Sequence, residues 1–133
     1  MKNTFIILIV GCLLTACDTP TQLIVPTYQT RVPRPVGLVA VQDTLANGKT
    51  TVTVSWSVST TANLKDFELY RSIAGDYFIM IQAGFIFTYQ DTTITWANPT
   101  DSLQLLQFAV VPIGIDRYRG QSSDTLSMYM TKK

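Results

Sequence analysis

The sequence contains no histidine, and among its 133 residues it has one glutamate, Glu68, and two cysteines. Histidine is the commonest general base and the commonest metal ligand in proteins. Glycoside hydrolysis needs two carboxylates that flank one bond, and most of the aspartates fall in predicted turns, where they accept hydrogen bonds from local backbone. Neither a glycine-rich phosphate loop nor a serine nucleophile elbow is present. We therefore expect no enzymatic activity, no metal site and no cofactor.

Charge of either sign is also scarce. Ten Lys and Arg residues face nine Asp and Glu residues, and they are scattered along the chain. Because nucleic-acid-binding domains carry a clustered basic surface, this distribution argues against a nucleic-acid partner. Long apolar runs are missing as well: Phe5 to Leu14 is too short for the roughly 20 residues that cross a bilayer.

The N-terminal segment has the order of a secretory signal. Lys2 supplies a positive charge, Phe5 to Leu14 is apolar, and small residues follow. The closing Leu14-Thr15-Ala16-Cys17 resembles the lipobox of bacterial lipoproteins, in which the signal peptide is cut just before a cysteine that becomes lipid-modified. The resemblance implies a signal peptide over residues 1–16. Two alternatives are a different secretory signal and a retained helix.

Lipidation of Cys17 would leave no free thiol, because cleavage also removes Cys12. The expected protein has no disulfide and is attached to the membrane through a covalent lipid. By this resemblance it resides in the bacterial cell envelope. We expect the outer membrane rather than the inner one, although Asp18 is a retention signal in some lipoproteins. Whether the domain faces the periplasm or the cell surface stays open.

Residues 17–35 are predicted to form a tether between the lipid and a domain over residues 36–131. Its four prolines rule out a helix or a central strand and favour an extended chain. The short apolar segment Leu23-Ile24-Val25 could instead pack on the domain as an added edge strand.

From residue 36 onward the chain alternates apolar and polar residues in short runs separated by turn residues, which predicts β-strands. In the second run Val52, Val54 and Trp56 share one face, so Trp56 is expected in the core. No window shows a helical repeat. The expected strands cover residues 36–42, 50–58, 66–72, 77–81, 85–89, 103–113 and 121–130.

These segments resemble a fibronectin type III domain from Pro33 to Met130. Val52-Thr53-Val54-Ser55-Trp56 is similar to the second strand of that family, and Phe67 to Ser72 to its third. Tyr89-Gln90-Asp91-Thr92 and Phe108 to Pro112 occupy later positions in the same order. The resemblance implies an all-β fold, an immunoglobulin-like antiparallel sandwich of about seven strands.

The sequence departs from the family at two places. Leu106 stands where the sixth strand usually has a tyrosine that closes one end of the sandwich, and Trp96 is a candidate to fill that corner. The loop that carries Arg-Gly-Asp in some animal adhesion domains reads Arg119-Gly120-Gln121 here. Integrin binding is therefore not expected.

The candidate binding residues are Trp96, Arg117, Tyr118 and Arg119. Exposed aromatic and guanidinium groups often anchor protein interfaces, and the last three lie in a predicted loop between strands. The sequence predicts a non-catalytic module that binds a protein of the envelope or acts as a scaffold. The alternatives are a carbohydrate-binding adhesion module that uses Trp96 or Tyr118, and a spacer domain without a ligand.

Overall fold

The structure, a computed structural model, describes residues 32–132, and all of its regular elements are strands. Cys17 and most of the predicted tether, including Leu23-Ile24-Val25, lie outside the described residues. Within residues 32–132 no helix is long and apolar enough to cross a membrane. The strands are β1 (Val36–Thr44), β2 (Thr50–Ser57), β3 (Leu64–Ile73), β4 (Ile79–Gly84), β5 (Thr88–Asp91), β6 (Leu103–Gly114) and β7 (Leu126–Thr131).

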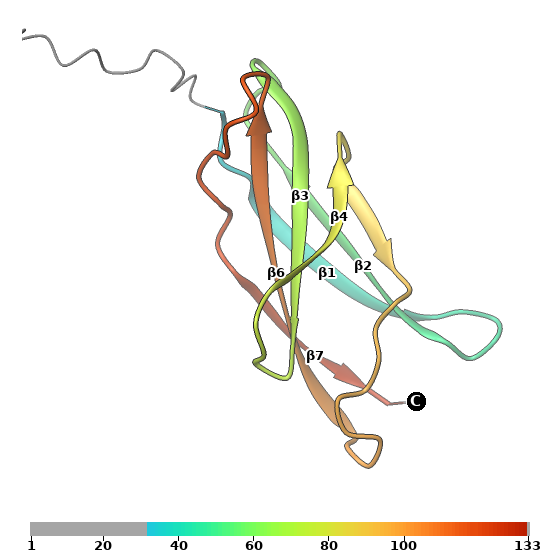
Figure 1. The fold of residues 1–133 in the computed structure, drawn as a ribbon. Helices are drawn as coiled ribbons and strands as arrows, with labels where there is room; N and C mark the ends of the chain where they lie inside the picture. Colours follow the sequence, from blue (N-terminus) through green and yellow to red (C-terminus); the bar gives the residue numbers. More distant parts are fainter. Residues whose placement is uncertain (1–31, 133) are drawn as a thin grey trace, which may run out of the picture.

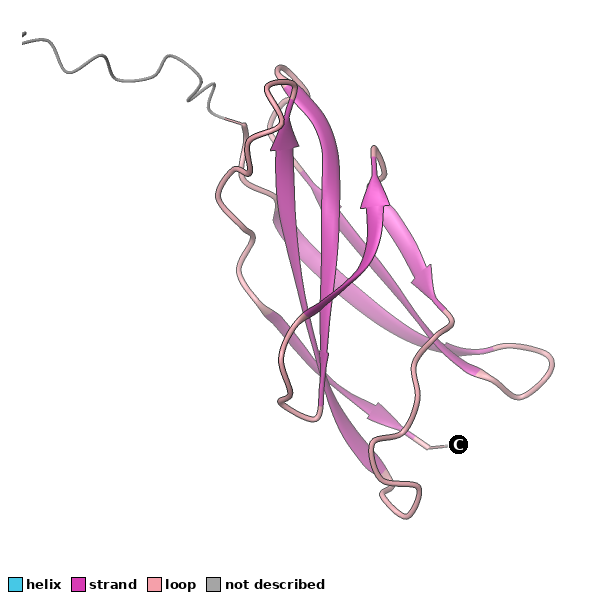
Figure 2. Ribbon diagram, in the orientation of Figure 1, coloured by secondary structure: helices cyan, strands magenta, loops and turns pink. Residues whose placement is uncertain are grey.

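The strands form two antiparallel sheets that pack face to face (Figures 1 and 2). One sheet has the order β1-β2-β5, and the other has the order β4-β3-β6-β7. The expected all-β sandwich of seven strands is therefore confirmed. β6, which contains the longest apolar run of the domain, is an inner strand of the larger sheet.

The core lies between the sheets and follows from the period of two in each strand. Val52, Val54 and Trp56 point inward from β2, and Trp56 is 5% exposed. The Trp56 ring meets Phe67 of β3 edge to face, with 5.6 Å between centroids. β6 contributes Leu106, Phe108 and Val110 to the same cluster, and β7 contributes Met130.

Three strands start later than the sequence patterns predict. β4 begins at Ile79 rather than residue 77, β5 begins at Thr88 rather than residue 85, and β7 begins at Leu126 rather than residue 121. Before β7, the hydroxyl of Ser123 accepts the N–H of Val110 at 3.0 Å. The backbone N–H of Ser123 donates to Val110 O at 2.8 Å, so at this pair of residues a side-chain oxygen replaces one of the two backbone acceptors.

The two flanks of the sandwich join the sheets in different ways. On the β4/β5 flank, Arg71 of β3 forms an ion pair with Asp91 of β5, and the two side chains are 5% and 0% exposed. On the β1/β7 flank, the Gln42 amide donates to Thr131 O at 2.7 Å and accepts from Thr131 N at 2.9 Å. One junction is buried and ionic, and the other pairs a side-chain amide with backbone.

The end of the sandwich near Leu106 is closed by a glutamine. Gln104, 4% exposed, donates from Nε2 to Thr95 O at 3.0 Å and accepts the N–H of Ala97 at 2.6 Å. Both partners lie in the connection between β5 and β6. In antibody-type sandwiches a tyrosine hydroxyl bonds to upstream backbone in this region, and Gln104 makes the equivalent bonds here.

Candidate binding loop

The connection between β6 and β7 begins with a tight hairpin at one end of the sandwich, and the bridge between Ile113 and Arg119 closes it. The N–H of Arg117 donates to Gly114 O at 2.8 Å, and the N–H of Gly114 donates to Tyr118 O at 2.9 Å. Asp116 accepts the N–H of Tyr118 at 3.1 Å, and the N–H of Ile115 donates to Asn63 O of the β2–β3 loop at 3.0 Å. The loop backbone is therefore held from within and from a neighbouring loop.

Arg117 occupies the strained position of this hairpin, with a φ of 67°. Three-residue hairpin loops of this kind place a residue in the left-handed region, where glycine is favoured. A residue with a Cβ costs about 1–2 kcal/mol there. The exposed side chain of Arg117 thus belongs to a residue whose backbone conformation is unfavourable.

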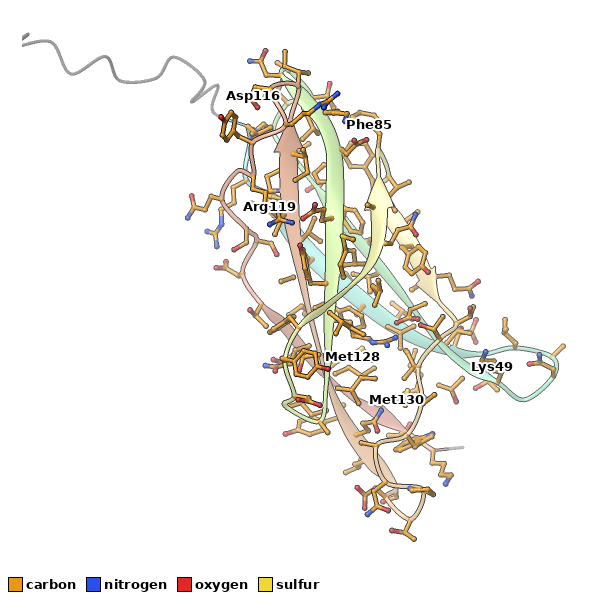
Figure 3. All side chains as sticks on the ribbon, viewed as in Figure 1. Lys49, Phe85, Asp116, Arg119, Met128 and Met130 are labelled. Atoms are coloured by element: carbon orange, nitrogen blue, oxygen red, sulfur yellow. The ribbon has the colours of Figure 1, made fainter. Side chains whose placement is uncertain are left out.

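Two large apolar side chains flank Arg117. Ile115 is 64% exposed and Tyr118 is 54% exposed. The loop therefore presents a cation between an aliphatic and an aromatic group, a combination that suits an interface anchor. Figure 3 shows Asp116 at this end of the domain.

Arg119 does not belong to the loop tip. Its guanidinium lies on the outer face of the larger sheet (Figure 3), where Nε donates to Glu68 Oε2 at 2.9 Å and Nη2 donates to Glu68 Oε1 at 3.3 Å. Nη2 also lies 3.2 Å from the hydroxyl of Tyr70, which donates to Glu68 Oε2 at 2.7 Å. The structure thus separates Arg119 from Arg117 and Tyr118.

This three-residue cluster shifts the titration of its acidic members. Burial raises the pKa of Glu68, but hydrogen bonds from Arg119 and Tyr70 and the charge of Arg119 outweigh it, so the pKa lies below its usual value. The hydrogen bond to Glu68 and burial raise the pKa of Tyr70. Both effects favour a charged carboxylate beside a neutral phenol.

Trp96 lies at the other end of the domain, in the connection between β5 and β6. β6 has 12 residues and separates the two ends by roughly 40 Å, so Trp96 and Tyr118 cannot share one site. The Trp96 ring is partly buried against the hydrophobic core. The Lys132 ammonium lies 5.5 Å from the ring centroid, which is a cation–π contact.

The described chain begins at the end that carries the loop. A Cβ placed on Gly120 would lie 3.1 Å from Cγ2 of Val32, so Val32 packs directly against the segment that follows the loop. The C-terminus lies at the opposite end of the sandwich (Figure 1). The first described residue and Arg117 therefore share one pole.

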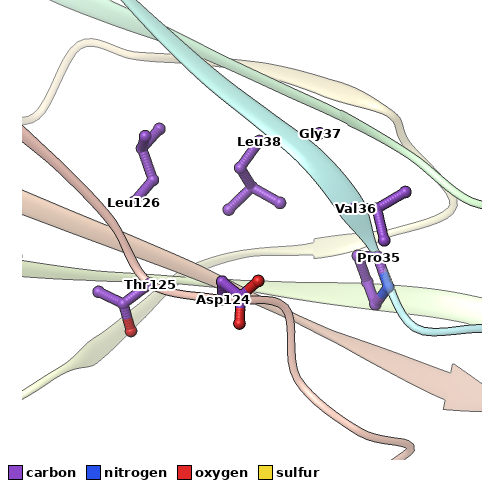
Figure 4. A pocket seen from close by; sticks show the side chains of 7 residues that line it. All are labelled: Pro35, Val36, Gly37, Leu38, Asp124, Thr125 and Leu126. Carbon is purple, nitrogen blue, oxygen red and sulfur yellow. The ribbon is translucent and has the colours of Figure 1, made fainter.

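A cleft of about 280 Å³ opens on the β1/β7 flank (Figure 4). It lies between the start of β1 and the segment that leads into β7, and an ion pair from Arg34 to Asp124, 2.5 Å long, lies beside it. Within residues 32–132 no group of three or more Cys, Asp or Glu side chains is placed to hold a metal ion. The cleft is lined by Pro35, Val36, Gly37, Leu38, Asp124, Thr125 and Leu126.

Comparison with known proteins gives matches in structure alone. No protein-family model matches the sequence, and neither does any curated protein. The sixth fibronectin type III domain of human fibronectin type III domain containing protein 3 superimposes with a TM-score of 0.59 at 12% identity, over 78% of this chain and 91% of that one. The fold is that of a fibronectin type III domain.

A second fibronectin type III-like structure supports the assignment. An Fn3-like protein from Clostridium thermocellum matches with a TM-score of 0.51 at 18% identity, over 71% of this chain and 86% of that one. At such identities the likeness concerns the fold, because fibronectin type III and other widespread folds carry many functions. Any function must be argued from this chain's own surface.

Sequence reasoning selected Arg117 and Tyr118 but missed the strain at Arg117. The signal for a left-handed residue is usually Gly or Asn in the turn, and the loop has arginine there. Sequence reasoning also missed that Arg119 pairs with Glu68. The two residues are 51 positions apart, and they meet because β3 pairs with β6 and Arg119 bridges Ile113 of β6.

Proposed function

We propose that this protein is a lipid-anchored lipoprotein of the bacterial cell envelope whose domain binds another envelope protein and catalyses no reaction. The anchor would be the lipid on Cys17, after removal of residues 1–16, and we favour the outer membrane. The proposed contact surface is the hairpin tip formed by Ile115, Arg117 and Tyr118. The support for the anchor is the lipobox resemblance of the sequence.

The observation that carries the binding role is the backbone of Arg117. A non-glycine residue in the left-handed region is unfavourable, and such residues concentrate where function requires them. Glycine at this position would relieve the strain at no evident packing cost, because the side chain is exposed. An arginine at this position, beside exposed Ile115 and Tyr118, is consistent with a recognition role for its guanidinium.

Carbohydrate binding through Trp96 receives less support from the geometry. A sugar-stacking platform needs an open ring face, whereas this ring is packed against the core and lies under the Lys132 ammonium. Glycan binding that disappears with Trp96→Ala, without loss of stability, would favour this alternative over the loop.

The test uses the full chain with a C-terminal tag, produced in its own cells and purified with its partners after mild cross-linking. Arg117→Gly should raise the stability of the domain by about 1 kcal/mol and yet lose the co-purifying protein. Arg117→Lys, which keeps the charge and the strain, is the matched control for stability. A partner that stays bound to Arg117→Gly would exclude the loop as the binding surface.

The same preparation tests the anchor. The mass of the purified parent chain should match residues 17–133 plus a covalent lipid, whereas Cys17→Ser should lose the lipid and keep residues 1–16, because this cleavage depends on the cysteine. If the parent chain carries no lipid on Cys17, the lipoprotein assignment is wrong even if the loop binds a partner.

A further inference from the structure

The flank formed by β4 and its neighbouring loops exposes large apolar side chains. We call it the β4 flank and define it by Tyr77, Phe78, Ile79, Met80 and Phe85. Their exposed fractions are 76%, 41%, 42%, 53% and 52%. Phe85 stacks on the buried Phe67 at 6.5 Å between centroids, so one part of this surface is continuous with the core. Figure 3 shows Phe85 beside the end of β4.

β4 is the last strand of its sheet, so the backbone groups along its outer side have no strand beside them in the part of the chain that the structure describes. Natural edge strands are usually protected by lysine, proline, inward-pointing charge, a β-bulge or a covering segment. β4 has one of these devices, a bulge at Ile81 where its pairing with β3 shifts register, so regular pairing with another strand is confined to either side of Ile81. Here no charged residue and no proline occurs from Tyr77 to Gln90, over 14 consecutive residues. The β4 flank thus has the amino-acid composition of a strand that pairs with another strand on both sides.

We propose that β4 pairs in antiparallel fashion with β4 of a second copy of this chain, so that two four-stranded sheets join into one continuous sheet. An antiparallel pair of identical strands is related by a two-fold axis, the commonest symmetry of protein dimers. The same apolar segment then lies on both sides of the contact. This inference goes beyond the proposed partner binding and uses neither Cys17 nor the Arg117 loop.

The apolar surface supplies much of the area that such a contact needs. With about 200 Å² for an aromatic side chain, the exposed parts of Tyr77, Phe78 and Phe85 amount to roughly 340 Å². Ile79 and Met80 add roughly 100 Å². If all of this exposed surface became buried, two copies would bury about 900 Å² of side chain, which is an upper limit because strand pairing leaves part of each side chain on the faces of the joined sheet. The paired backbone has to supply the rest of the roughly 1,000 Å² that specific interfaces need.

Charge does not oppose a second copy as the occupant. The nearest charged residue before the flank is Asp76, whose carboxylate accepts the N–H of Tyr77 at 2.9 Å. In an antiparallel pair the two Asp76 side chains lie at opposite ends of the contact and do not repel each other. An uncharged strand gives no electrostatic selection for an acidic or a basic partner, whereas it suits its own copy.

Disulfide cross-linking in intact cells tests the proposal with the full chain. Single cysteines replace Phe78, Met80 or Gln82 along β4, and Val41→Cys on the outer face of β1 is the control, because Val41 is 58% exposed. We expect a species of twice the chain mass on non-reducing gels for at least one β4 variant. The control and the parent, which has only Cys12 and Cys17, should give no more than a weak background.

A second substitution separates pairing from random collision. Tyr77→Lys added to the cross-linking variant should abolish the doubled species, whereas Val41→Lys should leave it unchanged. Both sites are highly exposed, so neither change should unfold the domain, and a thermal melt checks this. Equal cross-linking through Val41→Cys, cross-linking that survives Tyr77→Lys, or adducts formed only with a different protein would each overturn the proposal.

Discussion

The two flanks of the sandwich connect the two sheets through different kinds of interaction. The β1/β7 flank is closed at its surface, where Gln42 bonds to Thr131 across the sheets and Arg34 pairs with Asp124. The β4/β5 flank is closed from inside by the buried pair of Arg71 and Asp91 and leaves its outer edge apolar. A flank that is held together internally can keep its outer backbone available for another strand, which the first flank cannot do as readily.

The largest expected effect comes from breaking the buried junction. Asp91→Ala leaves the Arg71 guanidinium buried without its counter-charge, and it also removes the acceptor of the Thr93 N–H at 2.8 Å. We expect a loss of about 3–5 kcal/mol in the free energy of unfolding. Urea denaturation followed by tryptophan fluorescence measures it.

Replacing both Arg71 and Asp91 distinguishes the contribution of the ion pair from the contribution of burying these two side chains. Because apolar substitutes for a buried ion pair are often tolerated, Arg71→Met with Asp91→Leu should recover most of the stability lost by Asp91→Ala alone. A single substitution that costs less than about 1 kcal/mol would mean that the buried pair does not hold this flank.

The surface junction should matter less. Gln42→Ala removes all three hydrogen bonds between the Gln42 side chain and Thr131 at a solvent-accessible site, where a net loss of about 1 kcal/mol is expected. Amide hydrogen exchange should become faster at Thr131, whose N–H loses its acceptor, and should stay unchanged on β4. Equal acceleration on both flanks would show that the junctions are not independent.

The smallest effect is expected for the cluster of Glu68, Tyr70 and Arg119 on the outer face of the larger sheet, in which Arg119 is exposed and the two other side chains are partly buried. This cluster serves as a reference for the fully buried pair. The pKa of Glu68 is held below its usual value near 4.5. Its contribution to stability is therefore present above that value and is lost as the pH falls through the lower pKa of the folded state.

Glu68→Gln should remove this acid-dependent part of the unfolding free energy, and the change should be smaller than that caused by Gln42→Ala. Denaturation curves at a series of pH values from neutral to about 3, below the usual carboxyl pKa, provide the measurement. An identical pH dependence in the parent and in Glu68→Gln would contradict the assignment.

The sequence predicts the strands well where one face is buried. The alternation of Val52, Val54 and Trp56 indicates which side of β2 meets the core, since a period of two is a local property. It does not indicate the partner across the core. Arg71 and Asp91 belong to different sheets, and their pairing depends on how the sheets are stacked, which no local pattern encodes.

The candidate binding loop shows the same limit. Its position between two strands and its residue types could be predicted from the order of elements, as could the exposure of Tyr118. The direction taken by Arg119 could not, because it depends on the bridge from Arg119 to Ile113 and on the pairing of β6 with β3. The closure by Gln104 was missed for a related reason: a glutamine in an apolar strand gives no sign of which backbone groups it will meet.

The position of Val32 has a consequence for how the domain would stand on a membrane. Val32 and the Arg117 loop share one pole, and the chain between Cys17 and Val32 has 14 residues, which span at most about 50 Å when extended. With Cys17 anchored, as proposed, the loop would face the bilayer. It could then contact only molecules within about 50 Å of the membrane surface. Its partner would then be something that itself sits close to the lipid, while the Lys132 end of the domain points outward.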